Sequence, residues 1–244
     1  MKMAGSRRPF FIAPPTSRRG TATIPSHGLV YAASLEVDMY QGERLNTATH
    51  FVGLCLAAAA LVWLGPRMWL DGKPGSAAGF AIYGLSLLTV YGSSMLFHGT
   101  RGTSKATWAI VDHCAIYLLI GGTYTALALL SLEGPTLVIL LSAVWLLCLW
   151  GLINEAWLGR SRRPSVRRYV WLGWGAVAAL IPVMPEMNAW SLVALWGGAA
   201  VYTAGTLFYR NRRSLVHAHG VWHVFVIVGS ACHFLSIAAQ LRQG

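Results

Sequence analysis

The stretch that decides the fold reads HGVWHVFVIVGSACHFLSIAA and runs from His219 to Ala239. Most of its residues are apolar, and about 20 residues at a rise of 1.5 Å each suffice to cross a bilayer. At its start, His219 and His223 are four residues apart, which places them on one helix face about one turn from each other. Their ring nitrogens can converge on a single ion. Ionisable groups in membrane helices are costly and usually functional, so the stretch predicts a membrane helix that opens with a metal-binding pair.

The composition of the whole chain is that of an integral membrane protein. Of its 244 residues, 55% are hydrophobic and 11% are charged, whereas soluble domains carry roughly 25% charged residues. The formal net charge is +11, but the basic residues gather in a few loops where they set topology, so no nucleic-acid partner is expected. The four cysteines stand singly in apolar runs without a CxxC motif. Neither a disulfide framework nor a cysteine metal site is predicted.

Seven apolar stretches predict an all-α integral membrane fold, a seven-transmembrane helix bundle over residues 41–244 within the lipid bilayer. Most stretches have about 20 residues, the length of a membrane crossing. The fifth is the weakest, because Pro182 and Pro185 lie near its end. The stretches cover residues 47–64, 78–98, 109–131, 135–153, 169–185, 189–209 and 220–239.

The distribution of lysine and arginine predicts the orientation of the bundle. With the N-terminus in the cytoplasm and seven crossings, cytoplasmic segments contain sixteen of the 19 basic residues, which leaves Arg67, Lys73 and Arg242 for the other side. Cytoplasmic loops carry an excess of Lys and Arg in membrane proteins generally, and six or eight crossings would spoil this asymmetry. We therefore expect a multi-pass protein of the cell (inner or plasma) membrane, with the N-terminus cytoplasmic and the C-terminus outside.

Residues 1–40 differ from the rest of the chain, with two Arg-Arg pairs, several prolines and many Ser and Thr residues. This composition predicts a disordered basic tail. The alternatives are a transit-type targeting segment, which is also rich in Arg and Ser, and a mistaken start codon with true initiation at Met39. The apolar run 9–15 is too short and too broken for the core of a secretory signal.

The predicted topology brings three histidines and one carboxylate to a similar membrane depth. His98 ends the second apolar stretch, Asp112 lies about one turn inside the third, and His219 and His223 open the last. Three neutral imidazoles leave the fourth tetrahedral position of Zn²⁺ open for water. Such an ion activates the water it binds at near-neutral pH. The sequence thus predicts a site that several helices share.

Two further polar residues fit a role beside such an ion. Ser94 shares a helix face with His98, and it could hydrogen-bond a bound water or polarise a carbonyl. Asp112 could accept a proton from the water or orient a histidine. Simpler interpretations remain open: the histidines could be interfacial polar residues, Asp112 a helix cap, and Ser94 a hydroxyl bonded back to the backbone. Glu43, Asn46 and His50 could share a face of the first span, as an outer shell, as a gate, or as capping and packing residues.

Four segments of the sequence resemble the haemolysin III family, the bacterial branch of the progestin and adiponectin receptor superfamily. Together they extend over about residues 43 to 239, in the order of the family's motifs. The segments are Glu43–His50 (E-x-x-N-x-x-T-H), Ser94–His98 (S-x-x-x-H), Asp112–Thr125 (D-H-x-x-I-Y-x-L-I-A-G-T-Y-T) and His219–Val226 (H-x-x-W-H-x-F-V).

The resemblance implies a seven-helix fold with a cytoplasmic-side zinc ion. By motif position, its ligands would be His98, His219 and His223, and Ser94 and Asp112 would be the neighbouring catalytic pair. Since the superfamily is related to alkaline ceramidases, the resemblance also implies zinc-dependent hydrolysis of a lipid amide or ester.

Two positions depart from the family pattern, and three other function classes remain open. Ala126 stands where the family commonly has Pro, and Gly122 replaces a common Ala. One alternative is a non-catalytic protein with structural zinc that acts in membrane homeostasis or sensing. A second, suggested by the family name, is pore formation and cytolysis, which we disfavour because no export signal is recognised. A third is haem b between His50, His223 or His233.

Overall fold

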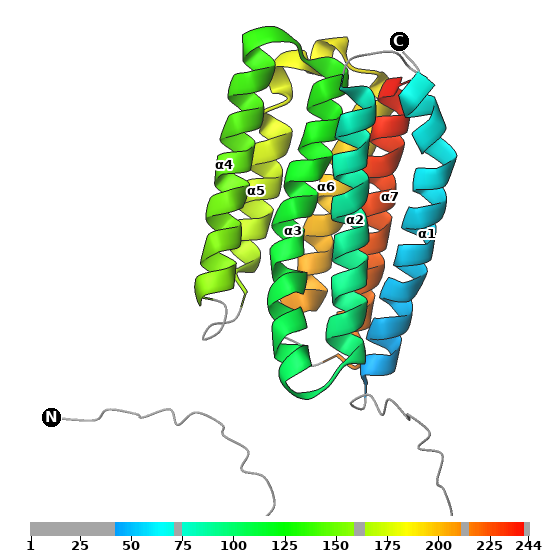
Figure 1. Cartoon of the computed structure of the whole chain (residues 1–244), viewed down its shortest axis with the longest axis vertical. Helices are drawn as coiled ribbons and strands as arrows, with labels where there is room; N and C mark the ends of the chain where they lie inside the picture. The colour runs from blue at the N-terminus through cyan, green and yellow to red at the C-terminus, as the bar shows by residue number, and fades with distance from the viewer. Residues whose placement is uncertain (1–41, 71–74, 159–163, 211–214, 242–244) are drawn as a thin grey trace, which may run out of the picture. The chain divides into compact units, whose positions relative to one another are not determined.

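The computed structural model describes residues 42–70, 75–158, 164–210 and 215–241, and all regular structure within these ranges is helical (Figure 1). The expectation of a disordered tail at residues 1–40 lies outside the described residues. In chain order the elements are α1 (Glu43–Leu70), α2 (Ser76–Gly99), α3 (Gly102–Ser131), α4 (Gly134–Leu158), α5 (Val166–Ala178), the 3₁₀ helix η1 (Ile181–Glu186), α6 (Ala189–Arg210) and α7 (Ala218–Leu241).

The surface and interior of the helical bundle are those of a membrane protein. Six helices, α1, α2, α3, α4, α6 and α7, are long and apolar enough to cross a bilayer. Large apolar side chains such as Leu85, Leu146 and Leu207 face outward, while histidines, serines and threonines lie buried among the helices. An apolar exterior around an interior that satisfies its own polar groups suits hydrocarbon as the solvent. The chain is therefore a multi-pass membrane protein.

The fifth apolar stretch differs from the other six in length and form. The sequence predicts a crossing there, but α5 has only 13 residues and falls short of a membrane span. It is followed by the six-residue η1, which contains Pro185. Proline lacks the N–H that an α-helix interior requires, which accounts for the change of helix type. In Figure 1, α5 lies between α4 and α6 and runs from the end where α4 finishes toward the end where α6 begins.

Helix α3 is the central element of the bundle, and α4 is peripheral. In its apolar window 67% of the residues of α3 are buried, against 17% for α4. Helix α3 packs against α2, α4, α5 and α7, while α1 packs against α2 and α7, α5 against α4 and α6, and α6 against α7. Polar groups carried by α3 therefore lie inside the bundle.

Close helix contacts occur at several glycines of the bundle. An added Cβ would contact Leu61 at Gly84, Trp145 at Gly121 and Tyr202 at Gly229. Small residues at such positions allow helix backbones to approach, as membrane bundles require. At Gly92 and Gly197, by contrast, no described residue lies within 4 Å of an added Cβ.

The helices that carry the predicted site residues have termini at one end of the bundle. Helices α1, α3 and α7 begin there, and α2 ends there (Figure 1). We call this the site end, because the first turns of α1 and α7 and the last turn of α2 carry the histidines and the carboxylate described below. Backbone N–H groups at the starts of three helices and carbonyls at the end of a fourth have no intrahelical partners there. Polar side chains are therefore expected at this end of the bundle.

Candidate metal centre

Three histidines from two helices meet at the site end. His98 lies in the last turn of α2, while His219 and His223 lie in the first two turns of α7. Their ligand nitrogens all lie within 4.8 Å of one another, and the Nε2 atoms of His98 and His219 are 3.2 Å apart. His98 and His223 are 3% and 1% exposed. The structure thus brings together the three residues that the sequence singled out as ligands.

The donor set of this cluster fits a metal ion. Ligand nitrogens about 2.0–2.1 Å from a tetrahedral zinc lie roughly 3.3 Å from one another. The His98–His219 separation of 3.2 Å is close to that edge, and all three ligand atoms lie within 4.8 Å of one another. Imidazole suits zinc, and three protein ligands leave one position for another molecule. The buried cluster is therefore compatible with a metal site.

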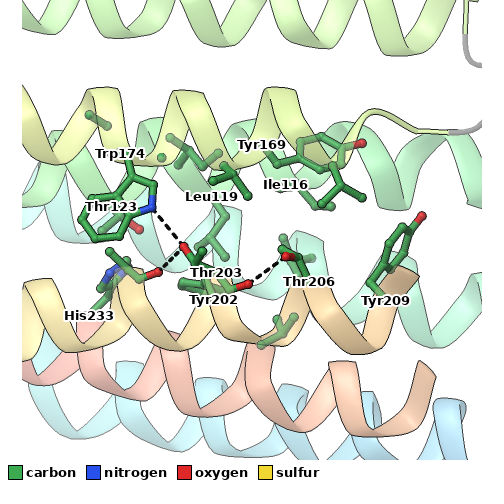
Figure 2. Close-up of a pocket in the computed structure, with 18 of the residues that line it drawn as sticks. Ile116, Leu119, Thr123, Tyr169, Trp174, Tyr202, Thr203, Thr206, Tyr209 and His233 are labelled. Atoms are coloured by element: carbon green, nitrogen blue, oxygen red, sulfur yellow. Dashed lines mark hydrogen bonds between the residues drawn. The ribbon is translucent and has the colours of Figure 1, made fainter. Parts of the chain in front are cut away.

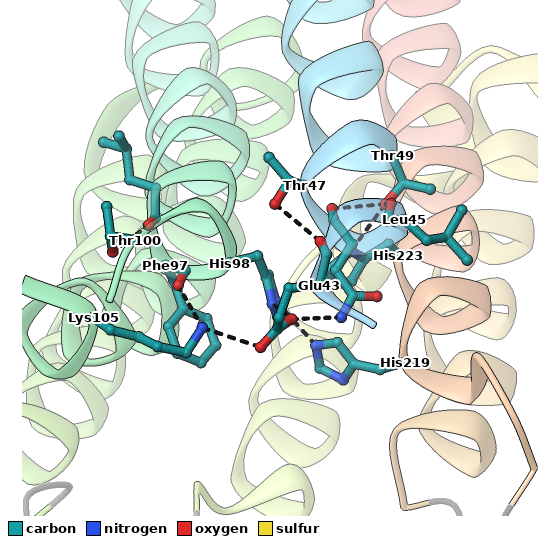
Figure 3. Close-up of polar contacts among 12 residues, drawn as sticks. Glu43, Leu45, Thr47, Thr49, Phe97, His98, Thr100, Lys105, His219 and His223 are labelled. Carbon is teal, nitrogen blue, oxygen red and sulfur yellow. Dashed lines mark hydrogen bonds and ion pairs between the residues drawn. The ribbon is translucent and has the colours of Figure 1, made fainter. Parts of the chain in front are cut away.

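The remaining ring nitrogens of two of these histidines face α1 (Figure 3). Nδ1 of His98 lies 2.5 Å from Oε2 of Glu43, the first residue of α1. Nδ1 of His223 lies 3.2 Å from the carbonyl oxygen of Asn46 and 3.1 Å from the hydroxyl of Thr49. Glu43 and Asn46 are among the residues that the sequence offered for an outer shell, whereas Thr49 had no predicted role.

A cavity of about 150 Å³ lies beside the cluster and extends along the bundle interior. Among the described residues, every α-helix other than α4 contributes to its lining, which is largely apolar. Figure 2 shows α3, α5 and α6 around it, with Tyr209 toward one end and Trp174, Thr203 and His233 at the other. His223 and His233 both line it and are about 15 Å apart along α7. The cavity is therefore elongated, as an extended apolar ligand would require.

The two residues that the sequence proposed as catalytic lie on this cavity. Ser94 of α2 and Asp112 of α3 both line it, as do His219 and His223. Ser94 is 1% exposed and is the hydrogen-bonding neighbour of the Asp112 carboxyl. His98 does not line the cavity, so the cluster meets it through the two histidines of α7. A carboxyl, a hydroxyl and two imidazoles thus face one interior space.

His50 of α1, which the sequence offered as a residue of an outer shell or gate, lies on the same cavity. It is 3% exposed and lines the cavity, and neither of its ring nitrogens has a hydrogen-bond partner. Its ring stacks on that of His223, with centroids 3.8 Å apart and planes 25° from parallel. Two histidine ligands of one haem have the haem between them, whereas the His50 and His223 rings are in direct contact. The His50–His223 pair therefore does not form the haem site considered above.

The fold and the cluster define a class of protein: a helical multi-pass membrane protein with a buried three-histidine cluster beside an apolar cavity. The model of the Haemolysin-III related family matches residues 39–234. The chain belongs to the haemolysin III family, as the four motifs predicted.

Individual relatives cover most of the helical region. Hemolysin-3 of Bacillus cereus is 32% identical over 197 residues, which are 80% of this chain and 90% of the relative. The Hemolysin-3 homolog of Bacillus subtilis is 35% identical over 197 residues, which are 80% of this chain and 92% of the relative. A human protein, monocyte to macrophage differentiation factor, is 28% identical over 163 residues, or 64% of this chain and 67% of the relative. The similarity thus extends from two bacterial proteins to a human protein.

Proposed function

We propose that this protein is a zinc-dependent hydrolase that cleaves an amide or ester bond of a membrane lipid. The observation that carries the proposal is the position of the three-histidine cluster beside an elongated, largely apolar cavity that also contains a carboxyl group. Zinc in such a site polarises a carbonyl and activates water for attack. The cavity would hold an acyl chain and keep bulk water away from the scissile bond.

Each residue of the site has a distinct task in this proposal. His98, His219 and His223 hold the ion. Asp112 takes the proton from the attacking water, because it is a carboxyl on the same cavity. Ser94 keeps the Asp112 carboxyl in place through its hydroxyl.

The buried side chain of His50 favours a substrate that places a polar group inside the cavity. A buried imidazole with two unpartnered nitrogens costs free energy, because its hydrogen bonds to water are lost on burial. An amide or ester next to the cluster would offer a carbonyl oxygen to the N–H of His50. We therefore assign to His50 a contact with the polar part of the substrate rather than with its acyl chain.

The protein crosses the cell (inner or plasma) membrane seven times in this proposal, with the N-terminus and the metal centre on the cytoplasmic side. Two features support it. With seven crossings, sixteen of the 19 lysines and arginines lie on the cytoplasmic side. The 13 residues of α5 at 1.5 Å each and the six of η1 at about 2.0 Å each amount to about 31 Å, near the thickness of the hydrocarbon core.

Cysteine accessibility tests this topology. In a variant that lacks the four native cysteines, Ser165→Cys before α5 and Glu186→Cys at the end of η1 are treated with a membrane-impermeant maleimide on intact cells. We expect labelling of Glu186→Cys at once and of Ser165→Cys only after permeabilisation. Labelling of both from the same side would mean six crossings and would overturn the orientation.

Lipid hydrolysis by the purified protein tests the proposed activity. The wild type, reconstituted in lipid nanodiscs and loaded with zinc, is incubated with N-acyl sphingoid and glycerol-ester lipids, and released fatty acid is measured. We expect release by the wild type and none above background by His219→Ala, with matching changes in the lipids of cells that carry each variant. No turnover by zinc-loaded protein, together with unchanged cellular lipids, would contradict the proposal. Dye leakage from liposomes that requires the intact cluster would favour pore formation instead.

A further inference from the structure

The first two turns of α1 contact the outward nitrogens of two candidate ligands. Glu43 accepts from His98 of α2, and the backbone of Asn46 accepts from His223 of α7. Both contacts link residues that are far apart in sequence, and both use Nδ1 of the imidazole. A neutral imidazole has one N–H and one lone pair, so the partner of one nitrogen determines what the other nitrogen can do.

The partner of His98 fixes which of its nitrogens is free to bind an ion. An ionised carboxylate only accepts hydrogen bonds, so Nδ1 of His98 must carry the proton that Glu43 accepts. Nε2 then has the lone pair, and it is the atom that faces His219, at 3.2 Å from that residue's Nε2. The Glu43–His98 pair thus has the form of a carboxylate–histidine–metal arrangement.

The partners of His223 likewise determine which of its nitrogens is free to bind an ion. A backbone carbonyl only accepts, and the Asn46 oxygen lies 3.2 Å from Nδ1 of His223. The Thr49 hydroxyl has a single proton, which it donates to the carbonyl of Leu45 or of Asn46, at 2.9 Å each. Toward His223 it therefore accepts as well, at 3.1 Å. Two acceptors at Nδ1 leave Nε2 of His223 as the ligand atom.

The carboxylate of Glu43 is itself held in place from three directions. Asn46 donates to Oε2 at 2.8 Å, and Lys105 of α3 donates to Oε1 at 3.0 Å. Lys105 also donates to the carbonyl of Phe97 at 2.9 Å, next to His98 (Figure 3). A helix-capping role for Glu43 would leave its carboxylate near the N–H groups of its own helix, whereas here it faces α2 and α3.

A glycine in α7 permits the approach of α1. Gly220 lies between His219 and His223, and an added Cβ there would lie 2.8 Å from Leu45 and 3.3 Å from the side-chain oxygen of Asn46. A larger residue would crowd the side chains of Leu45 and Asn46, in the turn of α1 that contacts His223. The pattern H-G-x-x-H thus provides both the ligand spacing and room for the helix that orients the second ligand.

We propose that the first two turns of α1 are the outer shell of the metal centre. Glu43 and the Asn46 backbone hold His98 and His223 as Nδ1–H tautomers, with both Nε2 atoms directed at the ion. This inference rests on the metal site of the proposed function, though not on hydrolysis. It makes Glu43 a positioning residue, since it acts on the ion through His98.

Zinc affinity of purified variants tests the inference, measured by competition with a chelator of known affinity. Glu43→Ala should bind zinc about 10–100-fold more weakly, the usual loss when the partner of a ligating histidine is removed. Glu43→Gln retains an oxygen that accepts from Nδ1 and should recover part of this loss. Lys105→Met is the matched control, because it removes the ion pair but leaves the Glu43–His98 bond. An ion pair near the surface contributes about 0–1 kcal/mol, so the zinc affinity of Lys105→Met should differ from that of the wild type by less than about fivefold.

A second readout separates orientation from stability. In protein labelled with ¹⁵N-histidine, the Nδ1–H form of His98 should give its tautomer-specific signals in the wild type and in Glu43→Gln, and a mixture of tautomers in Glu43→Ala. Zinc binding by Glu43→Ala as tight as in the wild type would overturn the inference. An equal loss in Lys105→Met would also overturn it, because Glu43 would then be only a clamp between helices. A wild type that binds no zinc would refute the metal centre itself.

Discussion

Asp112 is the residue whose replacement separates chemistry from metal binding. It lines the cavity with His219 and His223 but is not one of the three clustered histidines. Asp112→Asn keeps the shape of the side chain and removes its ability to accept a proton. We expect zinc content to stay at the wild-type level and turnover to fall about 100-fold or more, the usual contribution of a general base. Metal analysis and fatty-acid release on the same preparation measure both quantities.

Ser94→Ala is the companion variant for this prediction. Its hydroxyl contacts the Asp112 carboxyl, so its loss should lower turnover by less than the loss of the carboxyl itself. Turnover by Asp112→Asn that equals the wild type would exclude Asp112 as the base. Loss of zinc from Asp112→Asn would instead place Asp112 among the groups that support the ion.

At the scale of residues, the sequence predicted the members of the site better than their partners. His219 and His223 could be predicted because helical periodicity places residues four apart on one face. The contact between Glu43 and His98 could not be predicted from spacing, since 55 residues separate them. The proximity of His50 to His223 depends likewise on how α1 packs against α7. Tertiary packing decides such contacts, and a single sequence does not encode them in a local pattern.

Helix α2 contacts α3 closely at one glycine of the family-like motif. A Cβ at Gly122 would overlap the hydroxyl of Ser86, which is held by its hydrogen bond to the carbonyl of Tyr83 at 2.7 Å. Gly122→Ala, the residue common in the family, should therefore destabilise this chain by about 1–3 kcal/mol through overpacking. The double variant Gly122→Ala/Ser86→Ala should recover part of that loss. Thermal unfolding in detergent measures the effect.

Gly92 provides the control for this packing prediction. It also lies in α2, but nothing lies within 4 Å of an added Cβ. Gly92→Ala should leave the melting temperature unchanged or raise it, because alanine favours helix by about 1 kcal/mol over glycine. Equal melting temperatures for Gly122→Ala and the wild type would show that Ser86 moves aside freely. The close α2–α3 contact would then not restrict which residue can occupy position 122.

At the scale of elements, hydropathy predicted where helices lie but not where they begin. The apolar stretch 47–64 lies inside α1, which begins at Glu43, and the stretch 109–131 lies inside α3, which begins at Gly102. The missed first turns are polar, because they lie at the site end and carry Glu43 and Lys105. An apolar window excludes such residues, although Glu43 contacts His98 and Lys105 donates to Glu43.

Zinc should stabilise the whole molecule, because its proposed ligands lie on helices that are distant in sequence. A ligand that binds only the folded state adds about 4 kcal/mol to the free energy of unfolding at 1,000 times its dissociation constant. We expect a strong chelator to lower the melting temperature of the wild type and to leave that of His98→Ala unchanged. Equal responses of the two proteins would mean that the chelator acts elsewhere.

The class of the molecule was predictable because its signals are averages over many residues. Low charge content, long apolar stretches and the asymmetry of basic residues each sum over the whole chain, and the multi-pass helical structure agrees with the first two. The cavity was not predictable, since its lining combines residues such as Val90, Leu119 and Ala199 that look like ordinary core positions. Their common feature is the space between six helices, which exists only in three dimensions.

X-ray absorption at the zinc K-edge, with metal quantification on the same sample, tests whether the three histidines hold a zinc ion. The protein is purified in detergent without added chelator, beside His98→Ala. We expect about one zinc per chain with nitrogen ligands at about 2.0–2.1 Å in the wild type, and little or no zinc in His98→Ala. A wild type without zinc, a sulfur-ligated zinc, or the same zinc content in both proteins would contradict a metal centre built from His98, His219 and His223.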